Sequence, residues 1–186
     1  MRNISLKASV ALIAVALAAT PALANATADH SKPGHAVRHH HRHGGTLAAA
    51  VFLPKAAVAN RFEIVTGQLA QQRAESSAIK DLGAMFVADH TAGLKAVTDA
   101  ATALGVTLPT SLPPKQQAIV DQLSALSGAE FDAAFVRVQI PAHLKALRLY
   151  LHAAIRGENE QVRTVGQGGL PVITKHLGEL LDIAGA

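Results

Sequence analysis

Apolar residues recur at helical spacing through four long segments of the chain. The clearest segment spans residues 76–105, where apolar side chains fall three or four positions apart on one stripe. Ser76 or Ser77 is expected to cap this helix, and Gly105 is expected to end it. The stripe consists of Ile79, Leu82, Phe86, Leu94, Val97, Ala101 and Leu104. The pattern predicts an amphipathic helix with one face in a core.

The first predicted helix spans residues 46–75. Its apolar positions have helical spacing, and they are Val58, Phe62, Val65 and Leu69. We expect Pro54 in the first helical turn, where a missing N–H has no hydrogen bond to lose. Residues 47–53 are then an extra turn or short helix ahead of it.

Two more helices follow in the second half of the chain. The third helix is predicted to begin at Ser127, with Glu130 as its capping-box partner, to kink at Pro141 and to end at Gly157. The fourth helix is predicted over residues 159–183. It contains residues that disfavour a helix interior, so a kink or break is expected there: Gly168, Gly169 and Pro171.

A longer connection joins the second and third helices. Three prolines exclude a regular helix from residues 106–114, and a short helix is predicted over residues 115–126. Together these segments are long enough to run the length of a bundle. The predicted fold is therefore all-α: a ferritin-like four-helix bundle with one crossover connection and a short extra helix between its second and third helices.

Composition agrees with close-packed helices, because Ala and Leu dominate and aromatic residues make up only 3% of the chain. The chain has no Cys, which excludes disulfides and thiolate metal sites. Its formal charge of +4 includes Arg2 and Lys7, both inside a presumed signal sequence. The basic character of the remaining chain is modest and disfavours nucleic acid as a partner.

The N-terminal segment has the pattern of a cleavable secretion signal. Basic residues precede an apolar stretch at residues 8–19, Pro21 interrupts it, and Ala22-Leu23-Ala24 fits a cleavage site. The apolar stretch is shorter than the roughly 20 residues that a membrane span needs. Residues 1–24 are therefore predicted to be removed. The mature protein is expected in the periplasm or outside the cell, and association with the cell envelope is compatible with this prediction.

A polar, His-rich arm is predicted at residues 25–45, ahead of a bundle at residues 46–186. The arm has too few apolar residues to bury a core, so we expect it to be disordered. Its histidines are His30, His35, His39, His40, His41 and His43. One interpretation is loose binding of Cu, Zn or Ni. The favoured interpretation is a solvated spacer that gains positive charge below about pH 6.5.

Each long helix carries one polar residue near its middle, and the four are Glu63, His90, His143 and His176. Mid-helix residues of a four-helix bundle meet at mid-height, so these side chains are predicted to converge on a buried site. One carboxylate and three imidazoles suit Zn, Cu or Fe. Residues expected to orient them are Asp89, Asp132, Gln139 and Glu179. The alternative is a hydrogen-bonded network that only fixes helix register.

Enzymatic chemistry is disfavoured by what the helices lack. Di-iron carboxylate bundles carry two inward Glu-x-x-His pairs. The predicted bundle has none, and His176-x-x-Glu179 runs in the opposite order. A non-catalytic bundle that binds a metal ion or small ligand is the first functional hypothesis. A structural or interaction module of the cell envelope is the second, and a ferritin-like redox enzyme is the third.

Motifs in all four helices resemble those of an exported bacterial family, domain of unknown function 4142 (DUF4142). The similar stretches are residues 52–57, 85–90, 104–109, 126–132 and 170–177. The resemblance covers about residues 51–183, leaves the His-rich arm outside, and implies a ferritin-like bundle with no established activity. It implies that the following residues belong to the family motifs: Glu63, Asp89, His90, Asp132, Gln139, His143 and His176.

Overall fold

The computed structural model describes residues 45–185, and these residues form five α-helices and no strand. The predicted signal peptide and the arm up to residue 44 lie outside the described residues. The helices are α1 (Ala49–Arg73), α2 (Ser77–Ala103), α3 (Pro114–Ser124), α4 (Gly128–Arg156) and α5 (Glu160–Ala184). The predicted all-α fold, with a short extra helix before the third long one, is confirmed.

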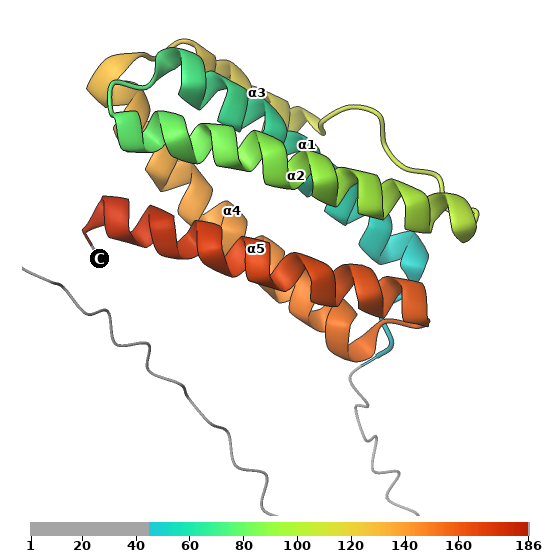
Figure 1. Ribbon diagram of the computed structural model, residues 1–186. Helices are drawn as coiled ribbons and strands as arrows, with labels where there is room; N and C mark the ends of the chain where they lie inside the picture. The colour runs from blue at the N-terminus through green and yellow to red at the C-terminus, as the bar shows by residue number, and fades with distance from the viewer. Residues whose placement is uncertain (1–44, 186) are drawn as a thin grey trace, which may run out of the picture. The chain divides into compact units, whose positions relative to one another are not determined.

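The long helices form two hairpins (Figure 1). In one hairpin α1 packs along α2, and in the other α4 packs along α5; α1 also contacts α4, and α2 contacts α5. The connection from α2 runs back along the bundle to α3, which packs on α1 and α4 (Figure 1). The predicted crossover is therefore present, whereas the ferritin-like classification itself stays a prediction.

Small residues bring α1 and α2 unusually close together. A Cβ atom at Gly67 would lie 2.7 Å from the backbone oxygen of Gly83, and one at Gly83 would meet the Gly67 oxygen at the same distance. Any larger side chain at either position would push the two backbones apart. The glycines therefore set the distance between the helices of the first hairpin.

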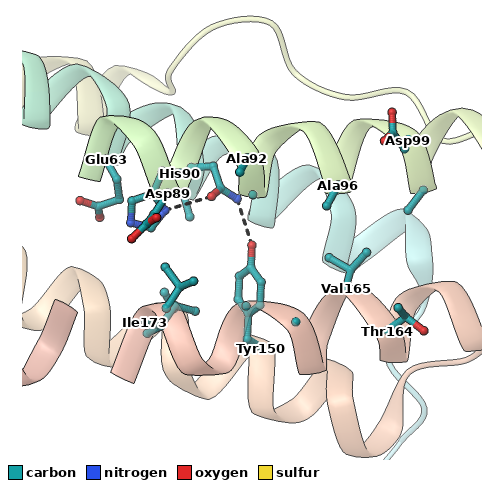
Figure 2. Close-up of a pocket in the computed structure, with 18 of the residues that line it drawn as sticks. Glu63, Asp89, His90, Ala92, Ala96, Asp99, Tyr150, Thr164, Val165 and Ile173 are labelled. Carbon is teal, nitrogen blue, oxygen red and sulfur yellow. Dashed lines mark hydrogen bonds between the residues drawn. The ribbon is translucent and has the colours of Figure 1, made fainter. Parts of the chain in front are cut away.

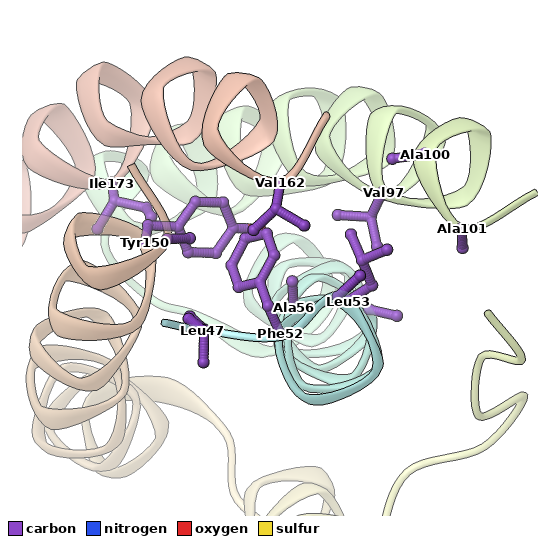
Figure 3. Packing of buried hydrophobic residues seen from close by; sticks show 13 residues of the cluster. Leu47, Phe52, Leu53, Ala56, Val97, Ala100, Ala101, Tyr150, Val162 and Ile173 are labelled. Carbon is purple, nitrogen blue, oxygen red and sulfur yellow. The ribbon is translucent and has the colours of Figure 1, made fainter. Parts of the chain in front are cut away.

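The core consists of two apolar clusters at opposite ends of the bundle. One contains Phe52, Leu53, Val97 and Tyr150 (Figure 3), and the other packs phenylalanines of α2 and α4 against Leu180. Buried polar side chains belong to neither cluster. They are Asn60, Glu63, Thr66, His90, Gln139, His143 and His176. Apolar material at both ends thus flanks a polar layer.

Of the kink or break expected in the last helix, the break is wrong, since α5 is continuous through both glycines and Pro171. The glycines are positions of close packing. The Tyr150 ring occupies the space that a side chain at Gly169 would need, and a Cβ at Gly166 would lie 2.5 Å from the Ala154 nitrogen. Contact with α4 therefore outweighs the low helix propensity of glycine, which amounts to about 1 kcal/mol per residue.

Two further details of the helix ends differ from the predictions. Helix α1 begins at Ala49, so Pro54 lies inside it and beyond its first turn. The side chains of Ser76 and Ser127 occupy N-cap positions but make no capping hydrogen bond, so the predicted capping box is absent. Asn159 does cap α5, accepting a hydrogen bond from the Val162 N–H.

Carboxylates from distant parts of the chain take over the capping of the first hairpin. Asp132 of α4 accepts hydrogen bonds from the N–H groups of Glu75 (3.1 Å) and Ser76 (2.9 Å), where α2 begins. Glu158 accepts one from the Ala49 N–H at 2.7 Å, where α1 begins. Each carboxylate ties one hairpin to the other.

None of the helices within residues 45–185 has the length and apolarity that crossing a membrane would require.

Asp132→Ala should lower the free energy of unfolding by about 1 kcal/mol, because it leaves two N–H groups at the start of α2 without an acceptor. Asp132→Asn keeps one acceptor oxygen, so its free energy of unfolding should lie between those of the parent and of Asp132→Ala. Urea unfolding followed by circular dichroism measures the change. Asp182→Ala, near the C-terminal end of α5, is the control and should not destabilise. An Asp132→Ala chain as stable as the parent would contradict the capping role.

Candidate metal centre

Three of the four predicted ligand residues meet in the polar layer. His90 comes from α2, His143 from α4 and His176 from α5, and all three are buried. One ring nitrogen from each lies within 4.8 Å of the other two. Helices that are far apart along the chain therefore place three imidazoles around one small volume.

The His90 ring is oriented by Asn60 of α1. Its Nδ1 lies 3.0 Å from the Asn60 Oδ1 atom. The Asn60 amide group cannot be turned round, because its Nδ2 donates to the Ala56 backbone oxygen at 2.8 Å and to the Tyr150 hydroxyl at 3.0 Å. The Oδ1 atom must accept, so His90 carries its proton on Nδ1. Figure 2 shows the chain of hydrogen bonds from His90 to Tyr150.

The other two rings are held in the same way. The His143 Nδ1 lies 3.0 Å from the Gln139 backbone oxygen, one helical turn earlier. The His176 Nε2 lies 3.0 Å from the Asp89 Oδ2 atom of α2. Carbonyl and carboxylate oxygens only accept hydrogen bonds, so each of these nitrogens carries the proton.

The second nitrogen of every ring is left without a hydrogen-bond partner. These atoms are the Nε2 of His90, the Nε2 of His143 and the Nδ1 of His176, and all are buried. Because the proton sits on the bonded nitrogen, each free nitrogen exposes a lone pair. A bonded nitrogen on one side and a free lone pair on the other is the arrangement of a metal-binding histidine.

Phe86 of α2 covers one side of the cluster. Its ring centroid lies 4.6 Å from that of His176, 4.8 Å from that of His143 and 5.7 Å from that of His90. Phe86 is itself fully buried within one of the apolar clusters. It keeps the three rings in place and excludes water from that side.

Burial keeps the imidazoles neutral. Loss of solvation lowers the pKa of His90 to about 3, with the neighbouring imidazoles His176 and His143 adding to the effect. It lowers the pKa of His143 to about 4, against the opposing hydrogen bond to Gln139. The pKa of His176 is also lowered by burial, with Asp89 opposing. Neutral imidazoles at neutral pH are available as ligands.

Glu63 lies beside the cluster, outside the group of three. Its Oε1 atom is 4.0 Å from the His143 Nδ1, the nitrogen that already bonds to Gln139, and its Oε2 has no partner. Burial raises the pKa of Glu63 well above its ordinary value, against a hydrogen bond to Gln139. The geometry therefore places Glu63 behind His143, away from the shared volume.

The four residues expected to orient the ligands separate into two pairs. Asp89 bonds His176, and Gln139 bonds His143 through its backbone oxygen while its side chain donates to Thr66 at 2.7 Å. Asp132 caps α2 at the end of the bundle, and Glu179 is exposed. Asn60 was not among the predicted residues, although its position one turn before Glu63 on α1 was a usable signal.

A cavity of about 790 Å³ opens beside the cluster. His90, His143 and Glu63 line one end, Tyr150 lies in its middle, and its walls are mainly alanine, glycine and valine of α2 and α5 (Figure 2). The cluster is thus enclosed by Phe86 on one side and adjoins open space on another.

Comparison with known proteins places the chain in a family. The family model described as "Domain of unknown function (DUF4142)" matches residues 35–183. This confirms the resemblance seen in the motifs, although the match begins inside the His-rich arm, which was expected to lie outside it. No curated protein matches the chain.

Two solved structures share the fold at low sequence identity. A DUF305 protein from Streptomyces coelicolor, described as secreted, has a TM-score of 0.62 and 11% identity, covering 73% of this chain and 91% of its own. A structure described as CopM in the Cu(II)-bound form has a TM-score of 0.62 and 16% identity, covering 74% of this chain and 95% of its own. At these identities the likeness extends to the helical bundle alone.

The protein should lose stability as the pH falls below 6.5. Between pH 6.5 and about 4 an unfolded histidine binds a proton and the folded His143 does not, so acid favours the unfolded state. His143 alone should account for about 2 kcal/mol of the loss from pH 7.5 to 5. His143→Gln should therefore unfold with a shallower pH dependence in urea titrations. The exposed His152→Gln is the control, and an equal slope in the parent and His143→Gln would refute this assignment.

Proposed function

The chain belongs to the DUF4142 family, whose description names no activity, and we propose that it is an exported protein that binds one transition-metal ion at His90, His143 and His176. Residues 1–24 are the cleaved signal, residues 25–45 the arm and residues 46–186 the bundle. Export is supported by the signal pattern at the N-terminus and by the similar fold of a DUF305 protein described as secreted.

The observation that carries the proposal is the set of three buried imidazole nitrogens without partners. A buried polar atom left unsatisfied costs about 1–3 kcal/mol, so three of them cost several. A metal ion would satisfy all three at once. Three nitrogens on one ion lie about 3.3 Å apart. The ring nitrogens lie within 4.8 Å of one another, so binding would draw them together by up to about 1.5 Å.

A purely structural network accounts less well for the same atoms. Such a network stabilises a fold when its members are satisfied. Here the three ring nitrogens are left without partners. Each ring makes a hydrogen bond through one nitrogen and leaves its other nitrogen without a partner. That distribution favours a binding site.

Copper(II) is the first candidate ion and zinc(II) the second. Neutral imidazoles suit both, and copper(II) binds most tightly of the divalent first-row ions at a given nitrogen site. The similar fold of CopM, described in a Cu(II)-bound form, adds support for copper. Iron is less well matched, because the two carboxylates near the rings, Glu63 and Asp89, both lie next to nitrogens that already carry a hydrogen bond. Binding without catalysis is the simplest role for this site.

Titration with Cu(II) and Zn(II) tests the proposal. The arm has histidines of its own, so the full mature chain is compared with a chain that begins at Gly45 and keeps every residue of both apolar clusters. We expect one tight site per chain in both, with a melting temperature raised by about 5–10 °C at an excess of metal. His90→Ala and His176→Ala should remove the site.

The titration has a clear negative outcome. If the chain beginning at Gly45 binds no metal while it keeps its helical circular dichroism, the three imidazoles are a structural cluster and the proposal fails. Variants that fold less stably but bind as tightly as the parent would lead to the same conclusion.

Asp89→Asn should weaken metal binding by about 10- to 100-fold, because the carboxylate that orients His176 is replaced by a neutral amide. Asp99→Asn on the same helix is exposed and should bind as the parent does. Glu63→Gln should stay within about tenfold of the parent if Glu63 stands behind His143, whereas a loss above 100-fold would make Glu63 a fourth ligand. Competition with a chromophoric chelator measures all three affinities.

A further inference from the structure

The cavity next to the imidazoles extends far beyond the space that one ion needs. Its volume of about 790 Å³ lies in the range of small-molecule sites, whereas one water or ion fills roughly 30 Å³. It follows α2 from Asp89 to Ala103, a distance of about 21 Å along the helix axis. Figure 2 shows Ala92 and Ala96 of α2 facing Val165 and Ile173 of α5 across this space.

Small residues keep this space open. On the α2 side the walls include Ala92, Gly93 and Ala96, and on the α5 side they include Gly168. A Cβ at Gly168 would meet nothing within 4 Å, so the helix passes the cavity without filling it. The result is a mainly apolar channel between two helices that belong to different hairpins.

Three residues that carry unpaired buried polar atoms line one end of the channel. His90 and His143 line it and each has an unpaired Nε2, and Glu63 lines it with an unpaired Oε2. Only 6%, 1% and 4% of these residues, in that order, is exposed. A mainly apolar channel with a few buried polar side chains at one end has the composition of a ligand site.

Tyr150 supplies one more polar group midway along the channel. Its hydroxyl oxygen accepts a hydrogen bond from the Asn60 Nδ2 at 3.0 Å, so the hydroxyl proton remains available as a donor. Burial raises the pKa of Tyr150 to about 12, which keeps that proton in place at any physiological pH. A ligand oxygen or nitrogen lying beside Tyr150 would receive this hydrogen bond.

We propose that the channel takes a small organic molecule whose nitrogen or oxygen donor binds the metal ion next to His90 and His143, and whose apolar body lies between α2 and α5. The inference rests on the proposed function, since three imidazoles leave a coordination position open to a further ligand. The molecules that fit are narrow, with one azole or carboxylate head and a flat or linear apolar body. Phe86 closes the opposite side, so the channel is the route to the ion.

Two azoles that differ only in their apolar body test this proposal. The full chain is loaded with one equivalent of Cu(II) and titrated with imidazole or 4-phenylimidazole, while the copper absorption and electron paramagnetic resonance spectra are followed. The phenyl ring buries about 100 Å² more apolar surface, so 4-phenylimidazole should bind at least tenfold more tightly than imidazole. His90→Ala, titrated in parallel, gives the spectrum of copper held by other histidines.

Matched substitutions on α5 and α2 place the effect in the channel. Gly168→Leu and Ala96→Leu fill the channel from opposite walls and should abolish the preference for 4-phenylimidazole while one copper ion stays bound. Gly178→Leu, on the same helix as Gly168 and with equal room for a side chain, lies outside the channel and should keep the preference.

The outcomes separate this inference from the proposed function. Copper bound at the three imidazoles with no preference between the two azoles overturns the channel and leaves the metal site standing. A preference that survives both Gly168→Leu and Ala96→Leu overturns it as well. A parent chain that binds no copper beyond the His90→Ala background overturns both.

Discussion

The structure depends on the way in which it buries three imidazoles. A neutral imidazole has one donor and one acceptor, and an apolar bundle supplies partners for neither. Here each donor is satisfied by a group on a specific helix: Asn60 of α1 for His90, and Asp89 of α2 for His176. Together with the Gln139–Thr66 bond between α4 and α1, these contacts connect all four long helices in one layer. Sliding any helix by one turn would break at least one of them.

The two ends of the bundle are organised by a different rule, in which carboxylates cap helices of the opposite hairpin. Glu158 lies at the turn between α4 and α5 and receives the first N–H of α1, while Asp132 of α4 receives N–H groups at the start of α2. Close approach at Gly67 and Gly83 holds the first hairpin together, whereas α2 and α5 face each other across a channel. The hairpins are therefore joined at the ends and at mid-height.

The spacing of apolar residues was sufficient to predict the four long helices and the position of the candidate site at mid-height, because it indicates which face of a helix is buried. It placed His90, His143 and His176 in one layer. It did not exclude Asp132, although this residue lies close to the start of α4, at the end of the bundle and away from the layer of His143. The low helix propensity of glycine gave a wrong prediction at Gly169, because the Tyr150 ring of another helix packs there. Propensities of residues 166–171 carry no information about a contact with a distant residue. Asn60 was not predicted, because it acts through hydrogen bonds to His90 on α2 and Tyr150 on α4, and the sequence does not show that these side chains meet.

The three imidazoles stand on three helices drawn from both hairpins, and this has a consequence for the order of folding. Each hairpin is built from contacts between neighbours in sequence, which form early because little chain entropy is lost in closing a short loop. His143 and His176 belong to one hairpin and His90 to the other. No folding intermediate with a single hairpin contains all three rings. The site therefore forms only when the two hairpins dock. An ion held by all three rings would slow the separation of the hairpins more than it would speed the folding steps that precede docking.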